Sequence, residues 1–231
     1  MVNLISRIVG KVCHVGASTI GSLLPKKGVV YMLHEVADSG EDLCVTEAEL
    51  ERFLSSLDRN KLIDLADWSD KSDFVAITID DVPENFYRKG FPLLKKYRVP
   101  FTLFVSTSLL DTPGFITTEQ LREMADCDLC TVGSHGTLHE FYKNFSHEEK
   151  IRFLEDSQKE LSAICGRPVE LFAFPYGSVY ACGFKDKKLV LKFYKYGFGT
   201  IGTNLTSLRL LPKYFLPRVN LSSGLIHCIY E

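Results

Sequence analysis

The chain has 231 residues, of which 45% are hydrophobic, and it carries a formal net charge of −2. This length and composition predict one globular domain, and the balanced charge argues against a nucleic-acid partner, whose binding requires clustered Lys and Arg. The seven cysteines are odd in number and irregularly spaced, unlike the disulfide framework of a secreted protein, and they predict a cytoplasmic location.

The first 27 residues predict an amphipathic segment that precedes the domain. Residues 1–34 contain no Asp or Glu. Apolar residues recur at helical spacing, at Leu4, Ile5, Ile8, Val9 and Val12. The segment lacks the apolar core and the cleavage site of a signal peptide, and it is too short and interrupted to span a bilayer. Two alternatives stay open: it packs against the domain, or residues 1–24 make a peripheral contact with a membrane surface.

Residues 28–231 alternate between short β-rich runs and helical stretches. The expected strands are Gly28–Leu33, Phe74–Ile79, Phe101–Ser106, Leu129–Gly133, Glu170–Phe174, Phe198–Gly202 and Phe215–Val219. Three expected helices begin with capping boxes, formed by Thr46 with Glu49, Thr117 with Gln120, and Ser146 with Glu149. This alternation predicts an irregular α/β barrel of about seven parallel strands, with its chemistry at the carboxyl ends of the strands.

Two adjacent carboxylates, Asp80 and Asp81, follow the expected strand that ends at Ile79. Successive strand residues point to opposite sides, so one carboxylate could bind a cation while its neighbour faces substrate or solvent. The alternative is that the pair caps the helix that follows.

Two histidines, His135 and His139, follow the expected strand that ends at Gly133. Their spacing of four residues can bring both rings to one cation if the segment turns helically. Neutral imidazole together with carboxylate suits Zn²⁺ or a similar divalent metal.

A third polar turn, Pro175-Tyr176-Gly177, follows the expected strand that ends at Phe174. Such a turn can offer a backbone N–H to an oxyanion and an aromatic wall to a sugar ring. An ordinary turn accounts for these residues equally well when they are taken alone.

The three clusters, in this order, resemble the motifs of the polysaccharide deacetylases of carbohydrate esterase family 4, the nodulation-protein-B homology domain. That family carries T-F-D-D-G, H-S/T-x-x-H and R-x-P-Y. The matching residues here are Thr78-Ile79-Asp80-Asp81-Val82, His135-Gly136-Thr137-Leu138-His139 and Ala173-Phe174-Pro175-Tyr176. Two further segments, Tyr31–Val36 and Pro217–Val219, are similar to the branch that modifies surface polysaccharides or exopolysaccharides, so the resemblance covers roughly residues 28–220.

The resemblance implies a catalytic domain over residues 28–231 that removes N-acetyl groups from a sugar of a cell-surface polysaccharide or its precursor. It implies that Asp81, His135 and His139 bind the metal, expected to be Zn²⁺, with Co²⁺ or Ni²⁺ as alternatives. Asp80 would be the general base, and the backbone N–H of Tyr176 would hold the oxyanion. The expected substrate contacts are His34, Pro175 and Tyr176.

The chain departs from the family pattern at several positions. Ala173 stands where many members have an arginine that orients the base, and we expect Arg218 to approach Asp80 from a late strand instead. Val82 and Gly136 also differ from the motifs. His227, in Leu225-Ile226-His227, is a candidate for the family's late general acid, with a chance match as the alternative.

Two other functions fit the same residues. The departures are compatible with a catalytically impaired carbohydrate-binding protein, although such a protein would not need Asp80 beside the metal ligands. The metal and base could equally serve a hydrolase of a non-sugar amide or ester.

Overall fold

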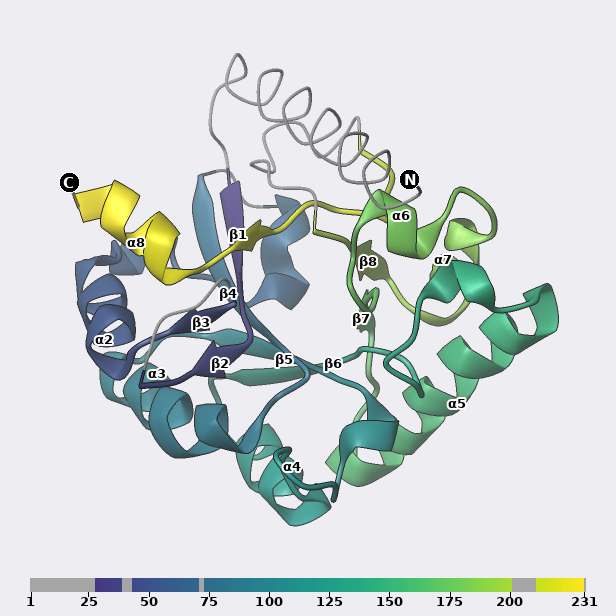
Figure 1. Ribbon diagram of the computed structural model, residues 1–231, viewed down its shortest axis with the longest axis horizontal. Coiled ribbons are helices and arrows are strands. Elements are labelled where there is room, and N and C mark those ends of the chain that lie inside the picture. Colours follow the sequence, from purple (N-terminus) through teal and green to yellow (C-terminus); the bar gives the residue numbers. More distant parts are fainter. Residues whose placement is uncertain (1–27, 39–42, 71–72, 201–210, 231) are drawn as a thin grey trace, which may run out of the picture.

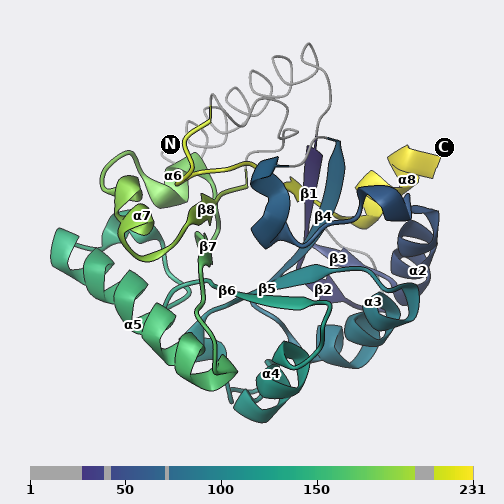
Figure 2. The same ribbon diagram turned by 180° about the vertical axis from the view of Figure 1, so that it is seen from behind.

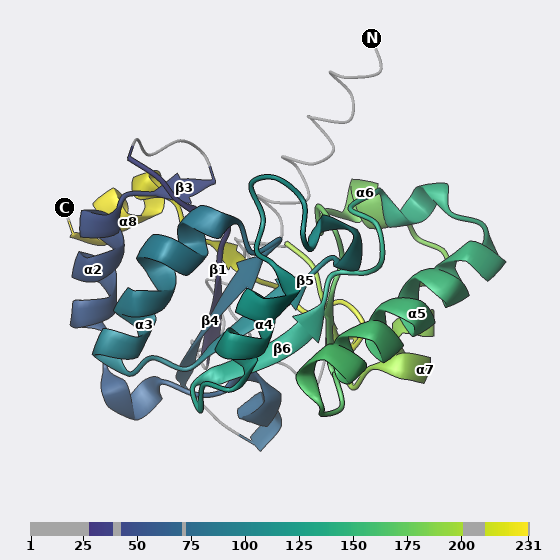
Figure 3. The same ribbon diagram turned by 90° about the horizontal axis from the view of Figure 1, so that it is seen from below.

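A seven-stranded sheet curls through the computed structural model, with helices on its outer face (Figures 1, 2 and 3). The structure describes residues 28–38, 43–70, 73–200 and 211–230, so the predicted amphipathic segment and its membrane contact lie outside the described residues. The strand order is β8-β7-β6-β5-β4-β1-β9, and every neighbouring pair is parallel. The predicted irregular barrel is confirmed.

Most strands form where hydrophobic and β-branched residues predict them. The sheet consists of β1 (Gly28–Leu33), β4 (Phe74–Asp80), β5 (Phe101–Val105), β6 (Cys130–Ser134), β7 (Leu171–Ala173), β8 (Tyr196–Phe198) and β9 (Val219–Asn220). A separate pair consists of β2 (Glu35–Val36) and β3 (Cys44–Val45). The first five sheet strands lie within one residue of the predicted ends, whereas β8 begins two residues before its prediction.

The predicted strand Phe215–Val219 is wrong in extent, because the chain changes partners within it. Leu216 pairs with Phe198 of β8, and Val219 pairs with Tyr31 of β1. The segment therefore passes from one edge of the sheet to the other and closes the barrel. Arg218 lies between the two pairings and is held at the closure.

The described residues form seven α-helices, and the three that were predicted from capping boxes begin where expected. The seven helices are α2 (Glu47–Ser56), α3 (Phe91–Tyr97), α4 (Thr118–Ala125), α5 (His147–Cys165), α6 (Val179–Cys182), α7 (Val190–Phe193) and α8 (Ser223–Tyr230). Short 3-10 helices lie at Arg59–Lys61, Leu65–Asp70, Thr107–Leu109, Tyr142–Asn144 and Lys187–Leu189, and a π-helical segment lies at Phe86–Gly90. All three predicted capping boxes are present, at the starts of α2, α4 and α5. Among the helices of the described residues, none is both long and apolar enough to cross a membrane.

Two apolar clusters fix the barrel. One lies between the sheet and the helices and contains Leu50, Phe86 and Phe153. The other contains Phe104 and Phe198, whose rings pack 5.7 Å apart between β5 and β8. Because these clusters hold the strands in place, the loops after their carboxyl ends meet at one edge of the barrel.

Candidate active site

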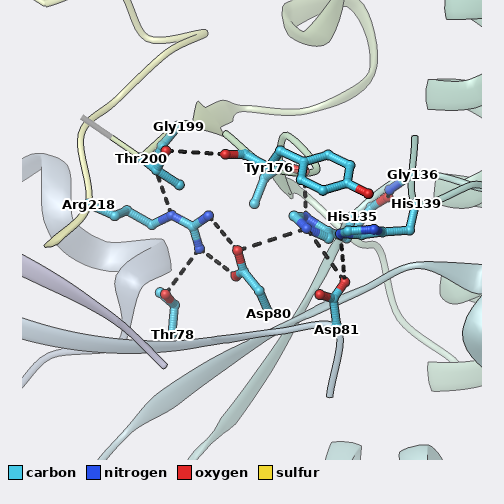
Figure 4. A network of polar contacts seen from close by, with 12 residues as sticks. Thr78, Asp80, Asp81, His135, Gly136, His139, Tyr176, Gly199, Thr200 and Arg218 are labelled. Atoms are coloured by element: carbon cyan, nitrogen blue, oxygen red, sulfur yellow. Dashed lines mark hydrogen bonds and ion pairs between the residues drawn. The ribbon is translucent and has the colours of Figure 1, made fainter. Parts of the chain in front are cut away.

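Polar side chains from several strand ends line one cavity of about 350 Å³. Asp80 ends β4 and Asp81 follows it, His139 follows β6, and Tyr176 follows β7. The lining is completed by Met32, His34, Leu43, Thr200, Arg218 and Asn220. The structure thus brings together residues that are far apart in the sequence, and Figure 4 shows the central group.

Asp81, His135 and His139 form a candidate metal centre. Asp81 Oδ1 lies 3.7 Å from His135 Nε2 and 3.4 Å from His139 Nε2. The three ligand atoms lie within 4.8 Å of one another. Asp81 Oδ1 is buried without a hydrogen-bond partner, which is the state expected of an oxygen that serves a cation. One carboxylate and two imidazoles fit Zn²⁺ or another divalent metal.

A tight turn directs both carboxylates to the same cavity. Asp81 has φ 61°, and the N–H of Val82 donates to the carbonyl of Asp80 at 2.7 Å. The expectation that the two side chains point to opposite sides is therefore wrong, because strand geometry ends at Asp80. Val82 also has a positive φ, 51°, at the position where the family motif has glycine. Because its side chain is β-branched, this conformation strains the backbone by about 1–2 kcal/mol.

The two histidines meet through a loop and not through the helical turn that their spacing suggested. His135 Nδ1 lies 2.8 Å from the carbonyl oxygen of Ala173. A carbonyl can only accept, so Nδ1 carries the hydrogen and Nε2 keeps its lone pair for a metal. The loop itself is held by the N–H of Gly136, which donates to Ser134 Oγ at 3.0 Å.

Gly136 allows α5 to pack against this loop. It has φ 85°, and an added Cβ would lie 1.9 Å from Cζ of Phe153. We expect Gly136→Ala to destabilise the fold by about 3 kcal/mol, through positive-φ strain and overpacking, and to weaken metal binding. Urea unfolding with a metal titration measures both effects.

Gly114→Ala is the matched control for Gly136→Ala. Gly114 has φ 89°, and an added Cβ would meet nothing within 4 Å. It should show the backbone strain alone, about 1–2 kcal/mol. Equal destabilisation by the two substitutions would contradict the packing role of Gly136.

Asp80 and Arg218 form a buried, bidentate ion pair. The sequence predicted that Arg218 approaches Asp80, because position 173 is alanine and not the arginine of many family members. Arg218 Nη1 donates to Asp80 Oδ1 at 2.6 Å, and Nη2 donates to Oδ2 at 2.7 Å. The guanidinium also donates to Thr78 Oγ1 and to the carbonyl of Gly199. These contacts fix the direction of the Asp80 carboxylate (Figure 4).

The two carboxyl groups have opposite pKa shifts. Burial tends to raise the pKa of Asp80, but the charge of Arg218 and its hydrogen bonds to the carboxylate outweigh burial and lower the pKa to about 2. Burial, followed by repulsion from Asp80, raises the pKa of Asp81 to about 7. Burial lowers the pKa of His135 to about 3, so its imidazole is neutral and able to bind a metal at physiological pH.

The turn after β7 places Tyr176 in the cavity wall but leaves Pro175 out of it. Tyr176 has φ 60°, and its ring lies 4.5 Å from that of His139, centre to centre. Pro175 is buried and is not among the lining residues, so the structure gives it a role in shaping the turn and no place for substrate contact. The role of the Tyr176 N–H remains a prediction.

The remaining histidine predictions have different outcomes. His34 lies in the cavity wall, and its buried Nδ1 has no hydrogen-bond partner. His227 lies on α8, where Nε2 is 3.3 Å from Oε1 of Glu49 on α2, and it does not line the cavity. The prediction that His227 supplies the general acid is corrected on this ground: α8 packs against α2, so His227 lies at the outside of the barrel.

The amino-acid sequence is similar to those of known polysaccharide deacetylases. A family model described as polysaccharide deacetylase matches residues 68–195. The poly-β-1,6-N-acetyl-D-glucosamine N-deacetylase of Staphylococcus aureus is 30% identical over 166 residues, which are 64% of this chain and 54% of that protein. The chain therefore spans about half the length of this relative.

Solved structures show the same fold at lower identity. A polysaccharide deacetylase from Bacillus cereus superposes with a TM-score of 0.75 at 23% identity, over 85% of this chain and 65% of the other. IcaB from Ammonifex degensii superposes with a TM-score of 0.70 at 22% identity, over 89% and 96%.

Proposed function

Since the chain belongs to the polysaccharide deacetylase family, we propose that it removes N-acetyl groups from a sugar of a cell-surface polysaccharide or its precursor, with the help of a divalent cation. The observation that carries the proposal is the convergence of Asp81, His135 and His139 on one point, with Asp80 in the same cavity and held by Arg218. One carboxyl group is thus placed to bind a cation, and its neighbour is free to act as a base.

Asp81, His135 and His139 would hold the cation, with Zn²⁺ as the first candidate and Co²⁺ or Ni²⁺ as alternatives. A bound divalent cation supplies Lewis-acid chemistry, which polarises an acetamide carbonyl and lowers the pKa of a water. The hydrogen bond from His135 Nδ1 to Ala173 orients one ligand before the cation arrives.

Asp80 would accept the proton of the attacking water at Oδ2. Each carboxylate oxygen has two lone pairs, so Oδ2 can accept from Arg218 Nη2 and still take up a proton. Arg218 makes Asp80 a weaker base, but it also keeps the carboxylate ionised and aimed. We propose that Arg218 takes over the role of the arginine that many family members have at the position of Ala173.

His34 is suited to deliver a proton to the leaving nitrogen. It lies in the cavity wall outside the metal centre, and its Nδ1 is unpartnered. We expect His34→Asn to lower kcat on an N-acetyl sugar by about 100-fold but to affect an activated acetate ester much less, because that leaving group needs no proton. Equal losses of kcat on both substrates would instead assign His34 to substrate binding, which is the role that the family resemblance implies.

Acetate release from β-1,6-linked N-acetylglucosamine oligomers, the polymer in the name of the S. aureus relative, tests the proposed function. Metal-dependent release is expected. Hydrolysis of small amides or esters without any release from acetylated sugars would favour the non-sugar hydrolase. Binding of the oligomers without release from any substrate would favour the carbohydrate-binding protein.

A further inference from the structure

Three aromatic rings form a continuous row that leads away from the cavity. Tyr176 lines the cavity, Phe141 lies 4.5 Å from it, and Tyr180 on α6 lies 6.0 Å from Phe141, centre to centre. Both contacts are edge-to-face, at 89° and 83°. We call Tyr176, Phe141 and Tyr180 the aromatic row.

The row is exposed at both ends. Tyr176 is 51% exposed and Tyr180 is 53% exposed, and Phe141 between them is half-buried. Adjacent large aromatic side chains on the surface are unfavourable in water, and such patches beside a cleft commonly mark a binding groove. The aromatic row begins at the cavity wall, so a ligand on it would be continuous with one in the cavity.

Lys143 packs against the outer part of the aromatic row. Its Nζ lies 3.1 Å from the ring centre of Tyr180 and 5.5 Å from that of Phe141. A cation–π contact at an exposed site stabilises the arrangement of its partners by about 0.5–1 kcal/mol. This contact favours the arrangement of the rings before a ligand binds, which reduces the entropy lost on binding.

We propose that the aromatic row is a subsite for a second sugar ring, next to the one from which the acetyl group is removed. The apolar C–H face of a pyranose can stack on an aromatic ring, and the phenol hydroxyls of two tyrosines can pair with sugar hydroxyls. The steps of 4.5 and 6.0 Å along the row are comparable with the breadth of one sugar ring. This inference rests on the proposed function and narrows its substrate to oligomers or polymers.

Removing the outer ring tests the subsite. For the unsubstituted enzyme, we expect kcat/KM to rise from N-acetylglucosamine to its β-1,6-linked oligomers. In Tyr180→Ala this rise should shrink, with kcat/KM for the oligomer about tenfold lower through KM, because a stacked ring contact is lost. Tyr180→Phe keeps the ring and should retain most of the rise.

Two controls keep the test specific. The first is 4-nitrophenyl acetate, which is too small to extend from the cavity to Tyr180, so the ratio of oligomer to ester efficiency isolates the outer part of the aromatic row. The second is Phe184→Ala, which removes a ring that is 87% exposed and contacts Lys187. That variant should keep the ratio of the unsubstituted enzyme.

The outcomes separate this inference from the proposed function. An unchanged ratio in Tyr180→Ala, with melting temperature preserved, overturns the subsite. If Tyr180→Ala loses binding to anionic phospholipid vesicles but keeps the ratio of oligomer to ester efficiency, the subsite is overturned in favour of a membrane contact. Failure of the unsubstituted, metal-loaded protein to release acetate from any oligomer overturns the proposed function itself.

Discussion

Replacing Asp80 by asparagine should lower kcat for acetate release by about 10²- to 10⁴-fold, the usual contribution of a general base. Asparagine has nearly the shape of aspartate but cannot take up the proton of the attacking water. The side chain is buried and held at both oxygens by Arg218, so no water can readily replace it. Steady-state kinetics on an N-acetylglucosamine oligomer measure the effect.

The metal affinity of Asp80→Asn provides its control. Asp81, His135 and His139 stay in place in this variant, so the Kd for Zn²⁺ should change by no more than about threefold. Loss of activity together with loss of metal would assign Asp80 to the metal centre. Full activity in the metal-loaded variant would remove Asp80 from the mechanism.

Replacing Arg218 by leucine should destabilise the fold by about 3–5 kcal/mol, because Asp80 would remain buried without its partner. Removal of the guanidinium also leaves burial as the dominant influence, so the pKa of Asp80 must rise from about 2. Since the base acts in its ionised form, the acid limb of the kcat profile should move to higher pH. Urea unfolding and a pH–rate profile measure the two effects.

Arg218→Lys separates charge from geometry. Lysine restores a positive charge but cannot donate to both carboxylate oxygens in the manner of a guanidinium. We expect it to bring the acid limb partly back and to recover less of the rate. If Arg218→Leu has the stability and the pH profile of the unsubstituted protein, Arg218 neither supports nor orients Asp80.

The sequence predicts the frame of the fold because local signals and long-range packing agree there. Gly28–Leu33 is apolar, β-branched and bounded by turn signals, and it forms β1 with the predicted ends. The capping box of Thr46 with Glu49 needs only four residues and forms as predicted. Around Phe215–Val219 a strand pattern is present, but the change of partner from β8 to β1 depends on barrel closure, which no local pattern records.

The candidate site divides in the same way. Asp80, Asp81 and the two histidines stand in motifs, so the resemblance finds them. The contacts of Thr200 and Gly199 with the site had no sequence signal, because one is a small polar side chain and the other a backbone carbonyl. His227 matched a short motif but lies on α8, away from the cavity. The cytoplasmic location stays a prediction, since no described contact bears on it.

A zinc titration of chelator-treated protein tests the central claim most directly: that Asp81, His135 and His139 converge on one cation. The unsubstituted protein should bind one Zn²⁺ at this centre, more weakly as the pH falls below about 7, where the ion must displace a proton from Asp81. Asp81→Asn and His139→Gln should each weaken binding by about 100-fold or more. Binding as tight as that of the unsubstituted protein in either variant would contradict the account.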